Sequence, residues 1–289
     1  ADMSVGMLGA NGIVGAGLMG SEIAFTFALA GHEVILVDTT EEKLAAAKTR
    51  LASVYERGVL RGALPAGEGD AAFARLSTTT DRAALADRDF VTEAVFEEEG
   101  VKAEVFRALD AICKPDCIFA TNTSTLPISS LAAAVGEARR RRFLGTHYFS
   151  PVTRMKLVEV IPAFDTSPEI VAATLDLCRR VGKTPIEIKD VAGFAVNRLL
   201  HAFMIEAIRL VEEGVATPAD IDTACRLGLG HPMGPFELMD ATTSHLCLQV
   251  QEILQEAYGE RFRPRPLLKQ RVRAGLVGGR GKPGWREKA

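Results

Sequence analysis

The stretch Gly15-Ala16-Gly17-Leu18-Met19-Gly20 decides the fold that this sequence predicts. A short apolar run, Gly12-Ile13-Val14, precedes it, and a helix is predicted over residues 21–30. A second apolar run over residues 34–37 then leads directly to Asp38. Strand, tight turn, helix, strand and acid follow one another in the order of a dinucleotide-binding βαβ unit.

The three glycines have separate roles in such a turn. Gly15 permits a backbone conformation that other residues resist, Gly17 lets the backbone approach a pyrophosphate, and Gly20 lets the helix pack closely on the strand. The N–H groups at the start of the helix face the phosphates, and the helix dipole favours their charge. The residues predicted to hold the cofactor here are therefore Gly15, Gly17, Leu18, Met19 and Gly20.

Asp38 lies 23 positions after Gly15, close to the usual distance of about 20 for the acid that binds an adenosine ribose. A carboxylate there would repel a 2′-phosphate, so NAD is favoured over NADP. A glycine-rich turn without a ligand also fits the motif alone, but the flanking strands and Asp38 favour a cofactor site. An overlapping frame at residues 9–12 would make residues 5–8 the first strand. The later frame spaces Asp38 correctly, although Asn11 and Gly12 are poor strand residues.

The composition is that of an ordinary globular chain. Its 289 residues, 47% hydrophobic and 25% charged, are enough for two domains. A net charge of −3 gives no general attraction to nucleic acid or to an anionic membrane. No apolar run approaches the roughly 20 residues of a membrane span, and the start does not resemble a secretory signal. Five cysteines without a Cys-x-x-Cys pair indicate no disulfide framework and no metal site, so we expect a cytoplasmic or other reducing compartment.

Beyond Asp38 the chain continues to alternate helices and strands. Helices over residues 41–57 and 70–76 flank a break that contains Gly and Pro, which predicts a helical hairpin projecting from the sheet. Arg57 and Arg61 lie near the tip of this hairpin. They are either solvated surface charges or contacts for the phosphates of a large anionic substrate.

Polar side chains follow the predicted strands, at the carboxyl ends where open α/β sheets collect their ligands. Glu93 lies near the end of a strand over residues 89–95. Residues 122–125, Asn-Thr-Ser-Thr, follow a strand over residues 117–121, as part of a site or as plain helix caps. The four arginines at residues 139–142, before the next strand, are interpreted as a solvated face.

His147 and Glu159 are 12 positions apart, on strands predicted over residues 143–147 and 155–161. If these strands pair as a hairpin, the imidazole and the carboxylate can meet. The carboxylate would then fix the tautomer of the histidine and stabilise its charged form, which makes a better proton acceptor. The spacing alone fits a structural His–Glu pair equally well.

The alternation of strands and helices stops near residues 189–190, and the remaining segments are helical. We therefore expect a Rossmann domain over residues 1–189 and a helical domain over residues 190–289. Asn197 begins the first helix after this boundary. A cleft between two domains is the natural place for a ligand.

Six stretches together point to one family: residues 15–21, 122–124, 147–151 (His-Tyr-Phe-Ser-Pro), 155–160, 193–198 and 232–238. In this order and spacing the chain resembles the L-3-hydroxyacyl-CoA dehydrogenase family, of the 3-hydroxybutyryl-CoA dehydrogenase type, along nearly its whole length. The resemblance is far more specific than the glycine motif. It implies a doubly wound Rossmann sheet with a helical hairpin insertion, and a C-terminal all-α domain that forms a homodimer.

In that family a histidine takes the proton of the 3-hydroxyl while hydride passes to NAD, and the matching residue is His147. Glu159 matches the glutamate that supports this histidine. Ser124 matches a serine that contacts substrate and cofactor, and Asn197 an asparagine near the thioester. The resemblance therefore implies reversible, NAD-dependent oxidation of the 3-hydroxyl of an acyl-CoA.

The resemblance also implies further contacts to the cofactor. Glu93 and Lys102 match positions near the nicotinamide. Ser150 matches another position near the cofactor, where the family often has Asn. The His-Tyr-Phe-Ser-Pro variant of this chain resembles the dehydrogenase part of multifunctional fatty-acid oxidation enzymes. Arg280, in a Gly-rich stretch looser than the family pattern, is the counterpart of a lysine near the nucleotide.

Two other functions stay open. One is a dehydrogenase for a free small hydroxy acid. Arg57 and Arg61 weakly favour a CoA ester over such an acid as the substrate. The other is a non-catalytic protein on the same scaffold, as among the enzyme-derived crystallins. The four catalytic candidates argue against this second alternative: His147, Glu159, Ser124 and Asn197.

Overall fold

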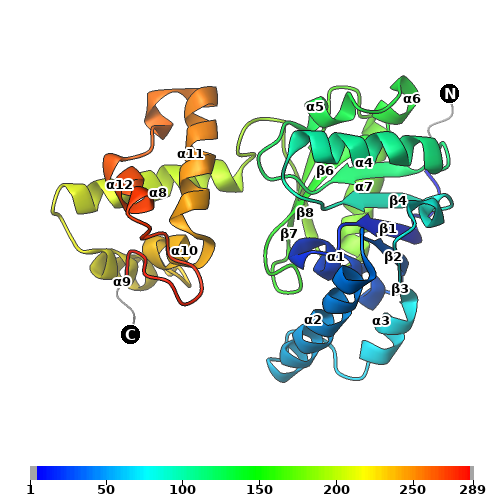
Figure 1. Ribbon diagram of the computed structural model, residues 1–289, viewed down its shortest axis with the longest axis horizontal. Helices are drawn as coiled ribbons and strands as arrows, with labels where there is room; N and C mark the ends of the chain where they lie inside the picture. The colour runs from blue at the N-terminus through cyan, green and yellow to red at the C-terminus, as the bar shows by residue number, and fades with distance from the viewer. Residues whose placement is uncertain (1–4, 287–289) are drawn as a thin grey trace. The chain divides into compact units, whose positions relative to one another are not determined.

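Residues 5–286 are described by a computed structural model, which divides into two compact units, Ala1–Asp190 and Val191–Ala289 (Figure 1). The outermost residues of both predicted domains lie outside the described range. Each unit has its own elements and its own core.

The first unit is built on one eight-stranded sheet in the order β3-β2-β1-β4-β5-β6-β7-β8. Neighbouring strands are parallel except for the antiparallel pair of β6 and β7. The first six strands have the order of a doubly wound dinucleotide-binding sheet, which reverses between β1 and β4. The strands are β1 (Ala10–Val14), β2 (Glu33–Val37), β3 (Leu76–Thr79), β4 (Phe90–Glu93), β5 (Ile118–Thr121), β6 (Phe143–Tyr148), β7 (Leu157–Pro162) and β8 (Thr184–Glu187).

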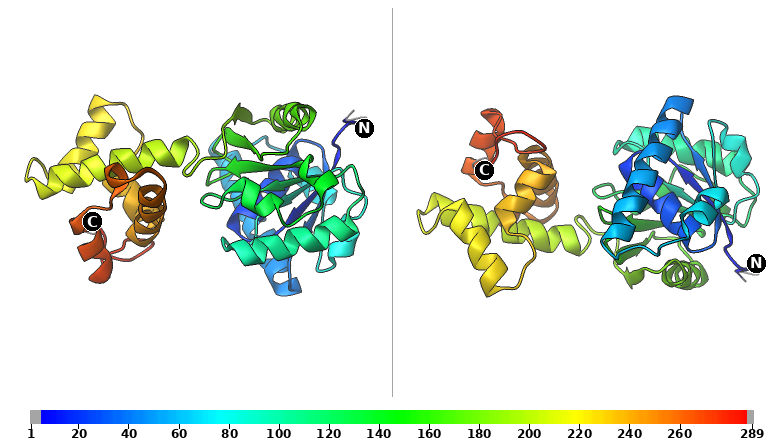
Figure 2. Two further views of the ribbon diagram at one scale, coloured as in Figure 1. Left: turned by 90° about the horizontal axis from the view of Figure 1, so that it is seen from above. Right: turned by 90° about the horizontal axis from the view of Figure 1, so that it is seen from below.

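Helices cover both faces of this sheet, which confirms the predicted Rossmann fold (Figure 1 and Figure 2). Helices α1 and α7 contribute to one apolar cluster, which includes Phe25 and Leu177. On the other face, the ring of Phe106 from α4 packs 5.8 Å from Phe119 and 4.7 Å from Phe143. The helices of this unit are α1 (Leu18–Leu29), α2 (Glu41–Leu60), α3 (Gly69–Arg75), α4 (Glu99–Ile112), α5 (Ile128–Ala132), α6 (Glu137–Arg140) and α7 (Pro168–Arg180), with a 3₁₀ turn over Arg82–Leu85.

The predicted helical hairpin is formed by α2 and α3, and α2 stands out from the sheet in Figure 1. The hydroxyl of Tyr55 fixes its turn, because it donates to the carbonyl of Pro65 (2.6 Å) and accepts from the N–H groups of Glu68 and Gly69. The segment after α3 was not predicted as a strand, and only its first residue, Leu76, was placed at the end of the preceding helix. It forms the edge strand β3, which is short and pairs with β2 alone.

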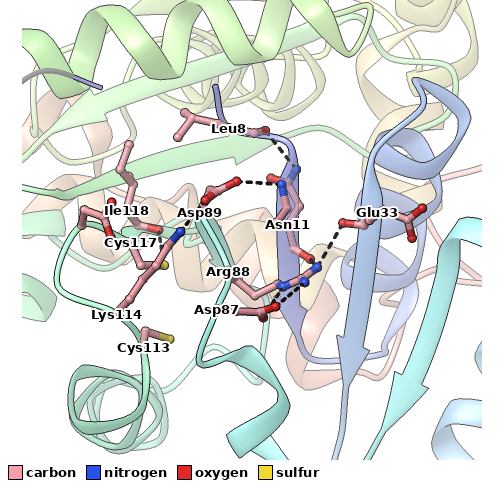
Figure 3. A network of polar contacts seen from close by, with 12 residues as sticks. Leu8, Asn11, Glu33, Asp87, Arg88, Asp89, Cys113, Lys114, Cys117 and Ile118 are labelled. Atoms are coloured by element: carbon pink, nitrogen blue, oxygen red, sulfur yellow. Dashed lines mark hydrogen bonds and ion pairs between the residues drawn. The ribbon is translucent and has the colours of Figure 1, made fainter. Parts of the chain in front are cut away.

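The first strand, β1, begins at Ala10, so the rival segment over residues 5–8 is not a strand. Figure 3 shows the polar network that holds its amino end. Asp89 accepts the N–H of Ala10 (2.9 Å) and pairs with Lys114 (2.6 Å). The side chain of Asn11 donates to the carbonyl of Leu8 (3.3 Å). These bonds satisfy the N–H of Ala10 and the side-chain NH₂ of Asn11, which would be costly to bury without partners.

The interpretation of residues 139–142 as a solvated face is wrong for Arg139, which is buried. Its guanidinium donates to the carbonyls of Cys113 (2.9 Å) and Cys117 (2.8 Å) and pairs with Asp110 (3.0 Å). The last carbonyls of a helix lack partners within the helix, and Arg139 supplies donors just beyond the end of α4. These carbonyls come close to Arg139 only in the folded chain, so the residues next to Arg139 in the sequence do not predict its burial.

The elements of the second unit are all helical over its described residues, 191–286, which confirms the predicted all-α domain. Trp285 lies in its core, 5.0 Å from the ring of Phe236, and donates its indole N–H to Ser244. Asp240 accepts the backbone N–H of Trp285 (2.8 Å) and so docks the Gly-rich C-terminal segment. The helices are α8 (Val196–Glu212), α9 (Pro218–Gly228), α10 (Pro235–Thr242), α11 (Ser244–Tyr258) and α12 (Pro266–Arg273), with a 3₁₀ turn over Glu260–Phe262.

The buried His201 makes the stability of this unit depend on pH. Burial lowers the pKa of His201 to about 4, from an ordinary value of 6.5. Between these values the unfolded chain binds a proton that the folded unit does not, so stability is lost as the pH falls from 6.5 towards 4. We expect about 3 kcal/mol of unfolding free energy to disappear between pH 7 and pH 4 on this account.

The measurement is urea unfolding followed by the fluorescence of Trp285, the single tryptophan, which reports on this unit. The variant His201→Gln removes the titrating group and should lose about 3 kcal/mol less stability than the unsubstituted protein over the same interval. An equal loss in both proteins would show that other groups carry the pH dependence.

Candidate active site

The geometry of the glycine turn separates the roles of its three glycines. Gly15 has a φ of +108°, and a Cβ there would lie 2.5 Å from the carbonyl oxygen of Ala94. A Cβ on Gly20 would lie 1.8 Å from the carbonyl oxygen of Gly15. A Cβ on Gly17 would meet nothing within 4 Å. The fold therefore requires Gly15 and Gly20, whereas the space beside Gly17 suits a ligand that approaches the backbone.

Asp38 follows β2 and holds the same turn. One of its carboxylate oxygens accepts the N–H of Ala16 (2.8 Å), and the other accepts the N–H of Thr39 (2.6 Å). Arg50, from α2, donates to the carbonyl of Ala16 (3.1 Å) and to the hydroxyl of Ser21 (3.0 Å). No spacing in the sequence marks Arg50, because α2 and the turn come together only in the fold.

The antiparallel pairing of β6 and β7 places His147 directly opposite Glu159. The Nδ1 atom of the imidazole is 2.9 Å from a carboxylate oxygen of Glu159. His147 is 5% exposed and Glu159 is fully buried, so this contact is shielded from solvent. The two strands therefore pair as the hairpin that contact between His147 and Glu159 requires.

Ser124 contacts the other side of the imidazole, with its Oγ atom 3.1 Å from Nε2. An ionised carboxylate can only accept, so Glu159 favours the tautomer of His147 that carries its hydrogen on Nδ1. In that tautomer Nε2 accepts a hydrogen bond from the hydroxyl of Ser124. The three side chains can thus hold a neutral imidazole ready to accept a proton at Nε2.

Glu97, in the loop after β4, positions Ser124 and was not predicted from the sequence. Its carboxylate accepts the hydroxyl of Thr123 (2.7 Å) and the backbone N–H of Ser124 (2.8 Å). Asn122 also joins the loop to β6, because its side-chain oxygen accepts the N–H of Tyr148 (3.0 Å). A carboxylate four positions after Glu93 was the available signal, but many loop carboxylates are simply solvated.

Glu93 and Lys102 lie beneath this loop as a buried ion pair 2.6 Å apart. Glu93 also accepts the hydroxyl of Thr121 (2.6 Å), and Lys102 donates to the carbonyl of Val95 (3.1 Å). Burial raises the pKa of Glu93, and the charge of Lys102 acts in the opposite direction. Both side chains are at most 1% exposed, so contact of either with a cofactor stays a prediction.

The other predicted residues lie at separate places. Ser150 is exposed in the loop after β6, and Arg57 and Arg61 are exposed near the tip of the α2–α3 hairpin. Asn197, in the first turn of α8, and Arg280, exposed in the Gly-rich segment, belong to the second unit.

Residues 5–286 contain no group of three or more His, Cys, Asp or Glu side chains arranged to hold a metal ion. Among these residues no helix is both long and apolar enough to cross a membrane.

Comparison with known proteins identifies the family. Residues 11–191 match the NAD binding domain of 3-hydroxyacyl-CoA dehydrogenase, and residues 193–288 match the C-terminal domain of the same family. The chain belongs to the 3-hydroxyacyl-CoA dehydrogenase family. It therefore has this family's NAD binding domain, as the glycine turn and Asp38 predicted.

Individual members of the 3-hydroxyacyl-CoA dehydrogenase family are similar over nearly the whole chain. A probable 3-hydroxybutyryl-CoA dehydrogenase of Deinococcus radiodurans is 40% identical, over 92% of this chain and 95% of its own. The solved structure of (S)-3-hydroxybutyryl-CoA dehydrogenase from Ralstonia eutropha has 34% identity and a TM-score of 0.92, covering 98% and 100% of the two chains. A solved diketoreductase, described as acting on dicarbonyl compounds, has 31% identity and a TM-score of 0.82 over 98% and 100%.

Proposed function

We propose that this protein catalyses the reversible oxidation of an L-3-hydroxyacyl-CoA to the 3-ketoacyl-CoA. The observation that carries the proposal is the chain of contacts from Glu159 through His147 to Ser124, in a unit that has the NAD binding domain of the family. When bound, NAD accepts the hydride that leaves C3 of the substrate. The proton of the 3-hydroxyl goes to Nε2 of His147, so the alcohol loses two electrons and two hydrogens.

Each residue of the contact chain has a separate task in this proposal. His147 takes the proton in oxidation and returns it in reduction. Glu159 keeps the imidazole oriented and stabilises its charge once the proton has arrived. Ser124 holds Nε2 and contacts the 3-oxygen of the substrate, because a hydroxyl can both accept and donate a hydrogen bond.

From the resemblance to the family we assign the thioester to Asn197 and the nicotinamide end of the cofactor to Glu93 and Lys102. From their place near the tip of the α2–α3 hairpin we assign the CoA phosphates to Arg57 and Arg61. Cofactor contacts by Ser150 and Arg280 complete the proposal. The exposed guanidinium groups of Arg57 and Arg61 support their part of it, because phosphates are recognised by such groups.

A dehydrogenase for a free carbonyl compound is the second candidate, because the similar diketoreductase is described as acting on dicarbonyl compounds. Competition by free CoA separates the two. If the substrate is a CoA ester, millimolar CoA should inhibit NADH oxidation competitively with the ketoacyl substrate. Activity that free CoA leaves unchanged, with a free keto acid as substrate, would favour the second candidate.

We further propose a homodimer formed through the helical unit. Several large apolar side chains of this unit are exposed, and burying them against a second copy would remove them from water. Light scattering should give twice the chain mass of 31.0 kDa, and a mass of 31.0 kDa would contradict the proposal. The most exposed of these side chains are Leu199, Val215, Leu227 and Leu229.

A reducing compartment such as the cytoplasm is proposed as the location. All five cysteines are buried with free thiols, which supports such a compartment.

A further inference from the structure

Two buried groups of opposite charge hold the loop that joins β6 to β7. This loop matters because β6 carries His147 and β7 carries Glu159. Its central part, residues 152–155, is referred to below as the hairpin loop. Glu22, from α1, and Lys183, directly before β8, both bond to it.

Glu22 binds the donors of the hairpin loop. One oxygen of its carboxylate accepts both the backbone N–H of Thr153 (3.2 Å) and the hydroxyl of Thr153 (3.0 Å). Glu22 is 2% exposed, among the buried residues of α1. A carboxylate is costly to bury unless hydrogen bonds satisfy it, so these two bonds restrict where Thr153 can lie relative to α1.

Lys183 binds the acceptors of the same loop. Its ammonium group donates to the carbonyls of Val152 and Met155, the latter at 2.9 Å. Lys183 is 7% exposed, and burial lowers the pKa of its ammonium group to about 8, while the charge of Glu22 acts in the opposite direction. The hairpin loop is therefore held by an anion at its donors and by a cation at its acceptors.

Helix α1 is the helix whose first turn follows Gly17 and faces the proposed pyrophosphate site, and Glu22 lies two positions after Gly20. A shift of the hairpin loop along α1 would therefore move His147 relative to the cofactor. Neither Glu22 nor Lys183 takes part in the chain of contacts around His147 described above. Their effect on the reaction is through the position of the loop.

We propose that Glu22 and Lys183 are positioning residues that fix the hairpin loop, and with it His147, against the cofactor helix α1. The proposal rests on the proposed function, in which C3 of the substrate loses a hydride and its hydroxyl loses a proton. NAD and His147 must both be in place to accept them. A displacement of about 1 Å at a reacting centre can cost roughly 100-fold in rate. Loosening the hairpin loop should therefore slow hydride transfer itself.

The experiment compares Glu22→Ala, which removes the acceptor, with Glu22→Gln, which keeps an oxygen for Thr153. Thr153→Val removes the hydroxyl donor and retains the backbone N–H. We expect kcat to fall by roughly 10- to 100-fold in Glu22→Ala and less in Thr153→Val, and to stay within about threefold in Glu22→Gln. The exposed Glu42→Ala is the matched control and should leave kcat unchanged.

A second readout separates positioning from loss of folded protein. With 4-deuterated NADH, the isotope effect on kcat should rise in Glu22→Ala, because hydride transfer becomes the slow step. A variant that is merely less stable has fewer active molecules but an unchanged isotope effect and an unchanged KM. The affinity for NADH should stay within about threefold, since the glycine turn is untouched.

Hydrogen exchange tests the structural part without any turnover. The amides of residues 152–156 should exchange at least tenfold faster in Glu22→Ala than in the unsubstituted protein or in Glu22→Gln. If the unsubstituted protein turns over neither acetoacetyl-CoA nor longer 3-ketoacyl-CoA esters, the proposed function fails, and the exchange rates still decide whether the hairpin loop is held. Unchanged exchange, or unchanged kcat and isotope effect in an active enzyme, would overturn the inference. Lys183→Met removes the cation and should likewise lower kcat and speed exchange in the hairpin loop, whereas Lys183→Arg keeps the charge and should do so less.

Discussion

Replacing His147 by glutamine should lower kcat by at least about 100-fold. A general base typically contributes about 10²–10⁴-fold to the rate. Glutamine is close to histidine in size and keeps polar atoms for Glu159 and Ser124, but it cannot take up a proton at the position of Nε2. The rate is measured from NADH absorbance with acetoacetyl-CoA at saturating concentrations. NADH should still bind within about threefold, because no contact of the glycine turn changes.

His245→Gln is the control for this substitution, since His245 is exposed on α11 of the second unit. It should leave kcat unchanged. Thermal unfolding of both variants verifies that the fold survives. If His147→Gln lost its affinity for NADH while keeping its turnover at saturation, the proton acceptor would have to be sought elsewhere.

Replacing Gly17 by valine should abolish most cofactor binding without unfolding the protein. A Cβ on Gly17 meets nothing within 4 Å, and the backbone there has a φ of −69°, which valine can adopt. The side chain would occupy the space that we assign to the pyrophosphate. Losing one charge-assisted contact costs roughly 1.5–3 kcal/mol, so the loss of one or two contacts should weaken NADH binding by roughly 10- to 10⁴-fold.

Fluorescence titration with NADH measures this affinity, and thermal unfolding should show a midpoint within about 2 °C of the unsubstituted protein. Gly9→Val, at another open position before β1, is the matched control and should bind NADH normally. Gly20→Ala should instead unfold the turn, because its Cβ would overlap the carbonyl oxygen of Gly15. Normal NADH binding by Gly17→Val would place the cofactor away from this turn.

Local patterns were enough to predict the parts of the fold that depend on neighbouring residues. The order of strand, glycine turn, helix and strand set the first βαβ unit and the frame of β1. The separation of 12 positions between His147 and Glu159 was compatible with a hairpin, and the register of β6 and β7 places the two residues opposite each other. The first βαβ unit and the β6–β7 hairpin each depend on residues that are close together in the sequence.

What escaped prediction depends on contacts between segments that are distant in the sequence. Arg139 is buried because it supplies donors to carbonyls more than 20 positions earlier in the chain. Glu22 lies inside an apolar helix, and its partner Thr153 is 131 positions away. Glu97 bonds to Ser124 across two neighbouring loops. A charged residue gives no local sign of the partner that the fold will bring to it.

The most direct test of the whole account follows NADH absorbance with acetoacetyl-CoA and, separately, with free acetoacetate. The account predicts oxidation of NADH with the CoA ester and none with the free acid, and loss of the activity in His147→Gln. Oxidation with the free acid alone would contradict it and identify a dehydrogenase for small acids. Oxidation with neither, in protein shown to bind NADH and tested also with longer acyl-CoA esters, would contradict it as well.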